Sequence, residues 1–194
     1  MKTRSFPVKK IILAVLAAAS STAFAAYTTD INSDITNESE VIIGASITNN
    51  ADITGVNLLK FNSTWKTLTN AANRTIDAVH FGERDVAPTT IKNFGTLITH
   101  DAQVDTSIDN SGIFKSHSSS LVMEGHTLTV RSGSSITQQN GALLDLISVT
   151  GPHTPVTIEA GSTLAANEIF IQSTISASCS LAGTLTGDDI TIEG

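Results

Sequence analysis

The residues best suited to chemistry are three aspartates spaced four apart, Asp101, Asp105 and Asp109. Lys92 and Lys115 lie nearby in the sequence. Enzymes that cleave polysaccharides use clustered carboxylates as acid, base or nucleophile. If Asp101 and Asp105 flank one strand they share a face, because side chains alternate along a strand, and Asp109 would lie on a neighbouring face. A polysaccharide lyase or hydrolase is therefore one hypothesis, although we favour the alternative that these acids solvate an outer surface.

The other chemistry-bearing residues show no pattern of a site. The five histidines lack the short spacing of metal ligands, so we expect them at exposed corners: His80, His100, His117, His126 and His153. Asp188 and Asp189 follow a glycine in an expected turn and supply too few oxygen ligands for calcium. A G-x-S-x-G motif is absent from the sequence. The sequence thus assigns no catalytic, cofactor-binding or metal-binding residue.

The N-terminal residues 1–25 have the pattern of a signal peptide. A basic segment precedes a short apolar run, and Ala23-Phe-Ala25 matches a small-x-small cleavage site. The apolar run is too short for a membrane anchor. We therefore predict export to the periplasm, the outer surface or the medium, which leaves residues 26–194 as the mature chain.

Charge and cysteine content narrow the partners further. The formal net charge is -7, and removal of the basic leader makes it more negative, which argues against nucleic acid as a partner. Cys179 is the single cysteine, so no internal disulfide can form, and we expect its side chain to be a small buried hydrophobe. No later apolar segment is long enough for a membrane helix.

Two nine-residue stretches are near copies of each other. Residues 128–136 read LTVRSGSSI and residues 156–164 read VTIEAGSTL, and a third copy is expected to begin at Ile190. Each copy has the pattern of a strand, a glycine turn and a second strand. Because one such unit cannot bury its apolar face alone, the repetition indicates stacked coils.

A period of 21 residues appears in the C-terminal third. It separates Leu164 from Leu185 and Ile169 from Ile190, and the residues between alternate as in half-buried strands. We predict an all-β, right-handed parallel β-helix with coils of about 21 residues, stacked at about 4.8 Å. A β-sandwich is the alternative, but sandwich strands do not repeat in register.

A looser motif, an aliphatic residue followed two positions later by asparagine, runs through the front half. Asparagine tolerates the left-handed backbone of a corner, and stacked asparagines can form a hydrogen-bonded ladder. The intervals of 12, 21, 23 and 17 residues are uneven, so some coils must carry loops. The five copies end at Asn37, Asn49, Asn70, Asn93 and Asn110.

Two segments interrupt the expected repeat and are the predicted contact regions. Residues 81–88 have the pattern of an excursion from the stack, and residues 116–126 of a break in it. Residues 56–90 also show a helix-like spacing of apolar positions, among them Trp65, but their threonines and asparagines favour strand and loop. Both contact regions have inert loops as the alternative.

The repeats at 128–136, 156–164 and 108–113 resemble those in passenger regions of bacterial autotransporters and related surface adhesins. The resemblance covers most of the mature chain and fits best from about residue 91 onward. It implies a right-handed β-helix displayed at the cell surface for adhesion or as a stalk. Its short motifs carry over no site residues, and we expect none of these residues to supply the C-terminal barrel strands of an autotransporter.

Together these observations predict an exported adhesion-type protein without catalysis, similar to an autotransporter passenger fragment. The expected partners are a host or cell-surface protein or glycan. The repeat stops within a unit at Gly194. We therefore expect either truncation of a longer chain or a partner, including a second copy, covering the last strand edge.

Overall fold

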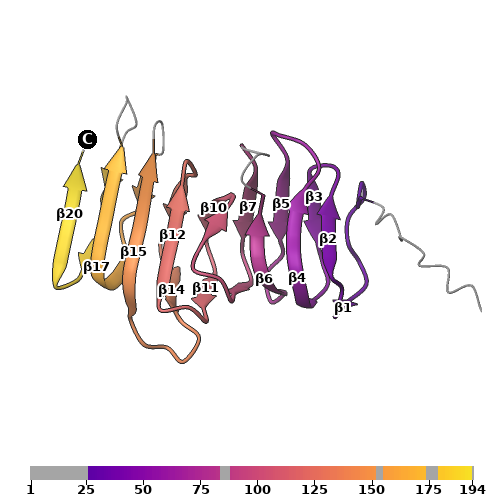
Figure 1. Cartoon of the computed structure of the whole chain (residues 1–194), viewed down its shortest axis with the longest axis horizontal. Coiled ribbons are helices and arrows are strands. Elements are labelled where there is room, and N and C mark those ends of the chain that lie inside the picture. The colour runs from indigo at the N-terminus through magenta and orange to yellow at the C-terminus, as the bar shows by residue number, and fades with distance from the viewer. Residues whose placement is uncertain (1–25, 84–87, 152–154, 174–178, 194) are drawn as a thin grey trace, which may run out of the picture.

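The computed structural model describes residues 26–83, 88–151, 155–173 and 179–193, and these form a parallel β-helix. Figure 1 shows the coils stacked side by side from the indigo N-terminal end to the yellow C-terminal end. Every strand pair in the described ranges is parallel. The predicted β-solenoid is confirmed, and the β-sandwich is excluded because its sheets are antiparallel.

Three sheets enclose the core. The first contains β3 (Ile47–Asn49), β5 (Thr67–Asn70), β7 (Thr90–Asn93), β10 (Ser107–Asn110), β13 (Leu128–Val130), β16 (Val156–Ile158) and β18 (Ser180–Leu181). The second contains β1 (Ile35–Thr36), β2 (Glu40–Ile43), β4 (Ile53–Phe61), β6 (Thr75–Gly82), β8 (Thr96–Thr99), β9 (Val104–Asp105), β11 (Ile113–Ser116) and β14 (Ser135–Gln138). The third contains β12 (Ser120–Glu124), β15 (Leu144–Gly151), β17 (Thr163–Ser173), β19 (Thr184–Thr186) and β20 (Asp189–Glu193).

The core consists of aliphatic side chains that occupy the same inward position in successive coils. In the first sheet Leu68, Ile91, Ile108 and Leu128 stack in register and are at most 1% exposed. Removing a side chain of this size from water contributes about 1.5–3 kcal/mol. Because each coil repeats this burial, the narrow core needs few aromatic residues.

The predicted 21-residue register is present where the sequence showed it. Leu164 pairs with Leu185 in β17 and β19, and Ile169 pairs with Ile190 in β17 and β20. The expected third copy at Ile190 is wrong, however. It stacks on β17 in the third sheet, whereas the unit shared by β13 and β16 continues into β18 of the first sheet.

The predicted asparagine ladder is also present, in four of its five expected members. Asn49 Nδ2 donates to Asn70 Oδ1 at 3.0 Å, Asn70 Nδ2 to Asn93 Oδ1 at 2.9 Å and Asn93 Nδ2 to Asn110 Oδ1 at 2.8 Å. All four side chains are fully buried. Asn37 lies outside this ladder, at the end of β1.

Coil length varies because the corners differ. Stacked partners in the first sheet are 17 residues apart between Ile91 and Ile108 but 28 apart between Leu128 and Val156. Residues 56–82 form strands and loops and not a helix, as predicted from the sequence. The predicted excursion at residues 81–88 begins later than expected, because Phe81 is buried within β6; residues 84–87 lie outside the described part.

Two further expectations are wrong. Residues 116–126 do not break the repeat, because β12 turns Leu121 and Met123 into the core as an ordinary strand. Cys179 is exposed rather than buried, since it precedes β18 in the last coil, which no described strand covers. Asp188 and Asp189 are exposed, as predicted, but only Asp188 lies in a bend, since Asp189 is the first residue of β20.

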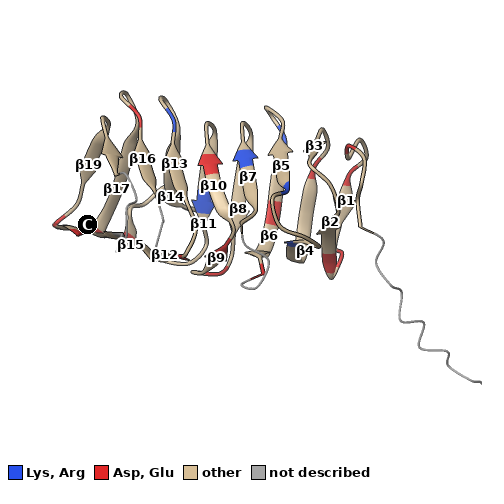
Figure 2. Cartoon of the chain, turned by 90° about the horizontal axis from the view of Figure 1, so that it is seen from above, with Lys and Arg blue, Asp and Glu red and all other residues tan. Residues whose placement is uncertain are grey.

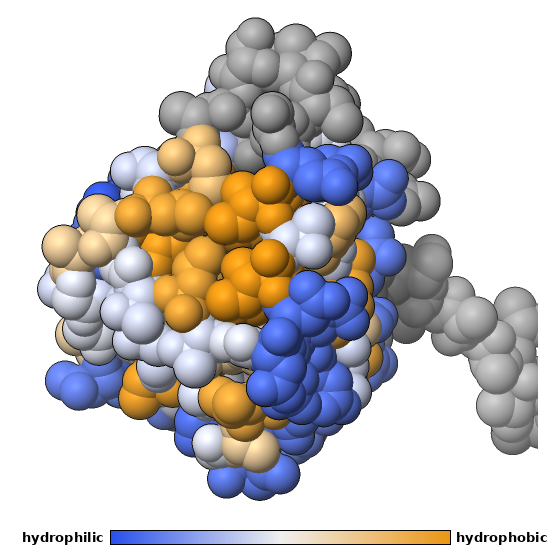
Figure 3. Space-filling view, turned by 90° about the vertical axis from the view of Figure 1, so that its left-hand side faces the viewer, coloured by the Kyte–Doolittle hydropathy of each residue, from blue (hydrophilic) through white to orange (hydrophobic). Residues whose placement is uncertain are grey.

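The last described coil leaves apolar side chains accessible. Figure 3 looks onto this end and shows a hydrophobic patch bordered by polar residues. Leu181, Ile190 and Ile192 are each between 37% and 44% exposed. Within the described ranges no strand pairs with the outer edges of β18, β19 and β20. The described ranges contain no helix long and apolar enough to span a membrane.

Candidate functional site

The fold brings two of the three predicted aspartates together on one histidine. His80 in β6 lies with Nδ1 3.3 Å from Asp101 Oδ2 and Nε2 3.2 Å from Asp105 Oδ2. Gln103 donates to the other oxygen of Asp105 at 2.8 Å. Both histidine contacts are hydrogen bonds only when both ring nitrogens carry a proton.

Asp109 lies elsewhere, on the outer side of the first sheet. Arg131 holds it through two hydrogen bonds, from Nε at 2.7 Å and from Nη2 at 2.9 Å, and donates a third to Glu159 at 2.6 Å. These two carboxylates raise the pKa of the guanidinium. Lys92 is the register neighbour of Asp109, whereas Lys115 lies in β11 of the second sheet. The predicted acidic cluster is thus divided between two places.

The prediction that every histidine lies at an exposed corner is wrong for His126. His126 is 2% exposed, and burial lowers its pKa although Asp105 opposes the shift. His100 contacts Asp77 at 2.7 Å and stacks on His117, with ring centroids 4.0 Å apart. His153 lies outside the described residues. The described part contains no group of three or more His, Cys, Asp or Glu side chains arranged to hold a metal ion.

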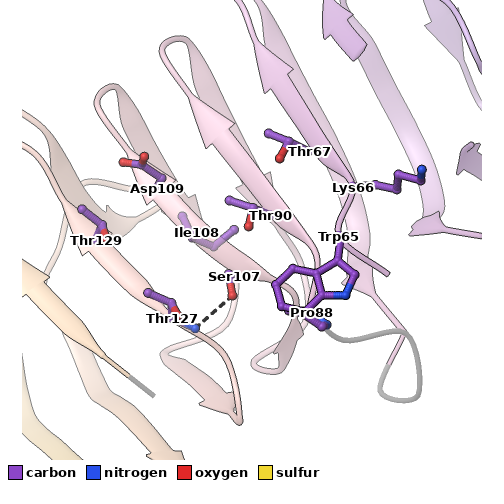
Figure 4. A pocket seen from close by; sticks show the side chains of 10 residues that line it. All are labelled: Trp65, Lys66, Thr67, Pro88, Thr90, Ser107, Ile108, Asp109, Thr127 and Thr129. Atoms are coloured by element: carbon purple, nitrogen blue, oxygen red, sulfur yellow. Dashed lines mark hydrogen bonds between the residues drawn. The ribbon is translucent and has the colours of Figure 1, made fainter. Parts of the chain in front are cut away.

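A groove lies on the outer side of the first sheet. Its volume is about 330 Å³, close to the lower end of ordinary ligand sites. Figure 4 shows Trp65 and Pro88 at one end and a field of threonine and serine side chains beyond them. The lining residues are Trp65, Lys66, Thr67, Pro88, Thr90, Ser107, Ile108, Asp109, Thr127 and Thr129.

Strand register arranges the outward side chains of the first sheet in two rows. Alternate residues of each strand point outward, and stacked strands keep these positions in line. One row contains Thr67, Thr90, Ser107 and Thr127, with the Thr127 N–H donating to Ser107 Oγ at 3.0 Å. A second outward row continues along the first sheet from β3 to β18, and of its members only Asp109 and Thr129 line the groove. It contains Thr48, Thr69, Lys92, Asp109, Thr129, Thr157 and Ser180.

Trp65 is held at this groove in an unfavourable backbone conformation. Its φ is +60°, in the left-handed region that bulky side chains rarely adopt. Its N–H donates to Pro88 C=O at 2.6 Å, and the Thr90 N–H donates to Lys66 C=O at 3.0 Å, so the corner is tied to the next coil. Trp65 is nonetheless 80% exposed. Strain of this kind costs about 1–3 kcal/mol and often marks a functional position.

Charge along the groove is nearly balanced. Figure 2 shows a basic residue on β7 beside an acidic residue on β10, and strand register identifies this pair as Lys92 and Asp109. Both oxygens of Asp109 are occupied by Arg131, so this carboxylate contributes little free negative charge.

The sequence does not mark Trp65 as a functional residue, because there it is only one member of a helix-like spacing. The signal available was that the single tryptophan of the chain lies between Thr64 and Lys66, where no apolar pattern requires it. No protein-family model, curated protein or solved structure matches this chain. The fold and the groove define its class, a β-solenoid with a surface groove on one sheet.

Proposed function

We propose that the chain is an exported β-helical protein that makes adhesion-type contacts at a cell surface, similar to an autotransporter passenger. The observation that supports this most is Trp65, an exposed tryptophan held over a groove on an otherwise polar sheet. The outer side of the first sheet, here termed the groove face, is the contact surface. The stacked coils of the described residues act as the scaffold that presents it.

Export is tested first. The full chain is expressed with its own leader in a Gram-negative host, and the N-terminus of the protein outside the cytoplasm is sequenced. Cleavage after Ala25 is the expected result. A protein that stays cytoplasmic with residues 1–25 attached would contradict the proposal.

Adhesion is tested with beads that carry the exported protein, applied to cultured cells and to bacterial lawns. Thr90→Arg, on the groove face, should reduce attachment. Thr137→Arg is the matched control, because Thr137 is an equally placed outward threonine on β14 of the second sheet. Absence of attachment to every surface would overturn the proposed function. An equal loss of attachment with both variants would show that the groove face is not the contact surface.

A polysaccharide-active enzyme is the second candidate function. The observation that favours it is the convergence of Asp101 and Asp105 on His80. Release of reducing ends or unsaturated products from a polysaccharide panel would support it, provided that Asp105→Asn abolishes the release. Inactivity across the panel would remove this candidate and leave the adhesion proposal unchanged.

A further inference from the structure

We infer that the groove on the first sheet binds a neutral glycan, with the indole of Trp65 stacked on one sugar ring. This inference rests on the proposed function, for which it names the ligand class. Figure 4 shows the indole directed over the groove rather than into the core. Because Trp65 is 80% exposed, its indole is available to a ligand.

An aromatic face beside hydroxyl groups matches the two surfaces of a sugar. The C–H face of a pyranose packs on an apolar ring, whereas its hydroxyls need donors and acceptors around the edge. Thr67, Thr90 and Thr127 are partly exposed and offer both. Ser107 is only 9% exposed, and its Oγ accepts the Thr127 N–H, so the three threonines are the main hydroxyl groups offered to a ligand.

The spacing of the rows suits a chain rather than a single sugar. Neighbouring strands lie about 4.8 Å apart, so hydroxyls recur along the row at about that distance. This is close to the length of one sugar unit in an extended polysaccharide. The ligand would therefore run along the solenoid axis, from Trp65 toward β13.

Charge argues for a neutral ligand. Of the two charged residues that line the groove, Asp109 is bound through both oxygens to Arg131, and Lys66 lies at the Trp65 end. One ammonium group at an edge does not form the cluster of cations that acidic glycans require. Most of the lining is uncharged threonine, serine, proline, isoleucine and tryptophan.

The chain contains a single tryptophan, so its fluorescence reports on the groove alone. The exported protein is titrated with cellohexaose, mannohexaose and hexagalacturonate while the emission is recorded. A saturable blue shift with a neutral hexasaccharide is expected, because stacking removes water from the indole. Calorimetry with the same sugar measures the affinity independently.

Substitutions then locate the site. Trp65→Ala should weaken binding about tenfold, and Trp65→Phe should retain part of it, because the smaller ring still stacks. Phe94→Ala is the matched control, since Phe94 is 52% exposed and does not line the groove. Circular dichroism verifies that each variant is folded.

Three outcomes would overturn the inference: no shift with either neutral sugar, binding of hexagalacturonate alone, or equal affinity after Trp65→Ala. Beads that adhere to cells while the protein binds no glycan would refute this inference but not the proposed adhesion. Glycan binding without any bead attachment would refute adhesion and leave the site intact.

Discussion

The asparagine ladder allows a quantitative prediction at Asn93, its best-connected member. Oδ1 of this side chain accepts from Asn70 Nδ2 at 2.9 Å and from the Gly95 N–H at 3.1 Å. Its Nδ2 donates to Asn110 Oδ1 at 2.8 Å, to Gly95 C=O at 3.2 Å and to Ile113 C=O at 3.0 Å. Asn93→Ala removes all of these bonds in the middle of the solenoid.

The cost follows from the groups left without partners. The Gly95 N–H and Asn110 Oδ1 lose the only side-chain partners that the described residues give them, whereas Asn70 Nδ2 keeps Arg74 C=O and Thr96 C=O. A buried polar group left unsatisfied costs about 1–3 kcal/mol. Two such groups predict that Asn93→Ala lowers the free energy of unfolding by about 2–6 kcal/mol.

Urea unfolding followed by far-UV circular dichroism measures this change. Asn50→Ala is the matched control, because Asn50 donates to Asn32 Oδ1 at 3.0 Å in a similar but exposed pair. Asn50→Ala should lower the free energy of unfolding by about 0.5 kcal/mol or less. If Asn93→Ala cost no more than Asn50→Ala, the ladder would not stabilise the stack and the reasoning would fail.

Three other substitutions test separate parts of the structure. Gly82→Ala should lower the free energy of unfolding in urea by about 3 kcal/mol, because Gly82 has positive φ and a Cβ there would collide with the Asp105 carbonyl. Gly125 also has positive φ but faces open space, so Gly125→Ala should lower it by about 1 kcal/mol. Burial lowers the pKa of His126 below 6.5, so its neutral form stabilises the fold above pH 6.5 and that contribution is lost as pH falls through the lowered pKa. His126→Gln should therefore flatten the acid side of a stability–pH curve, and an unchanged curve would contradict this. Arg131→Gln should lower the free energy of unfolding by about 1 kcal/mol or less at low salt, because the Arg131 side chain is 42% exposed. Thermal unfolding at high salt should show a smaller destabilisation, because salt screens the ion pairs.

The sequence predicted the fold because stacked coils impose identical demands at identical positions. Leu164 and Leu185, or Asn93 and Asn110, match in type because each contacts its equivalent in the next coil. Coil length is under weaker constraint, since a corner can lengthen outward without disturbing the stack. The offset between coils therefore varies, and the register could be located only where the repeat is regular.

The candidate site was harder to predict because it depends on that register. Asp101 and Asp105 contact a histidine that lies 21 and 25 residues earlier in the chain, so this contact can be predicted only when the length of the coil between them is known. Asp109 is close in sequence but lies beyond a corner, on another sheet. The rows of hydroxyls likewise appear only after the strands of the first sheet are aligned, and Trp65 has no repeat partner to mark it.

The expected reason for the asparagines and glycines at the corners needs correction. The four ladder asparagines do not have positive φ; the non-glycine residues of the described part that do are Asn37, Trp65 and Asn73. Gly95 and Gly112 are required instead by close approach, because a Cβ at either would collide with a backbone carbonyl of the preceding coil.

The two repeat motifs are two solutions to the same corner. In the ladder column Asn110 is followed by Val130 and then Ile158, which offer no hydrogen bonds to the turn. The corner after Val130 is closed differently: Gly133 adopts φ +77°, and Ser134 Oγ donates to Arg131 C=O at 2.6 Å.

The next coil repeats that arrangement with Gly161 at φ +82° and Ser162 Oγ donating to Glu159 C=O at 2.6 Å. An inward asparagine hydrogen-bonds the backbone groups of the turn from the core side. In the glycine–serine pair the serine hydroxyl bonds a carbonyl within the turn itself, so the inward position can hold an aliphatic side chain. The front and back halves therefore differ in motif but keep one stack, because in both the buried backbone groups of the corner find partners.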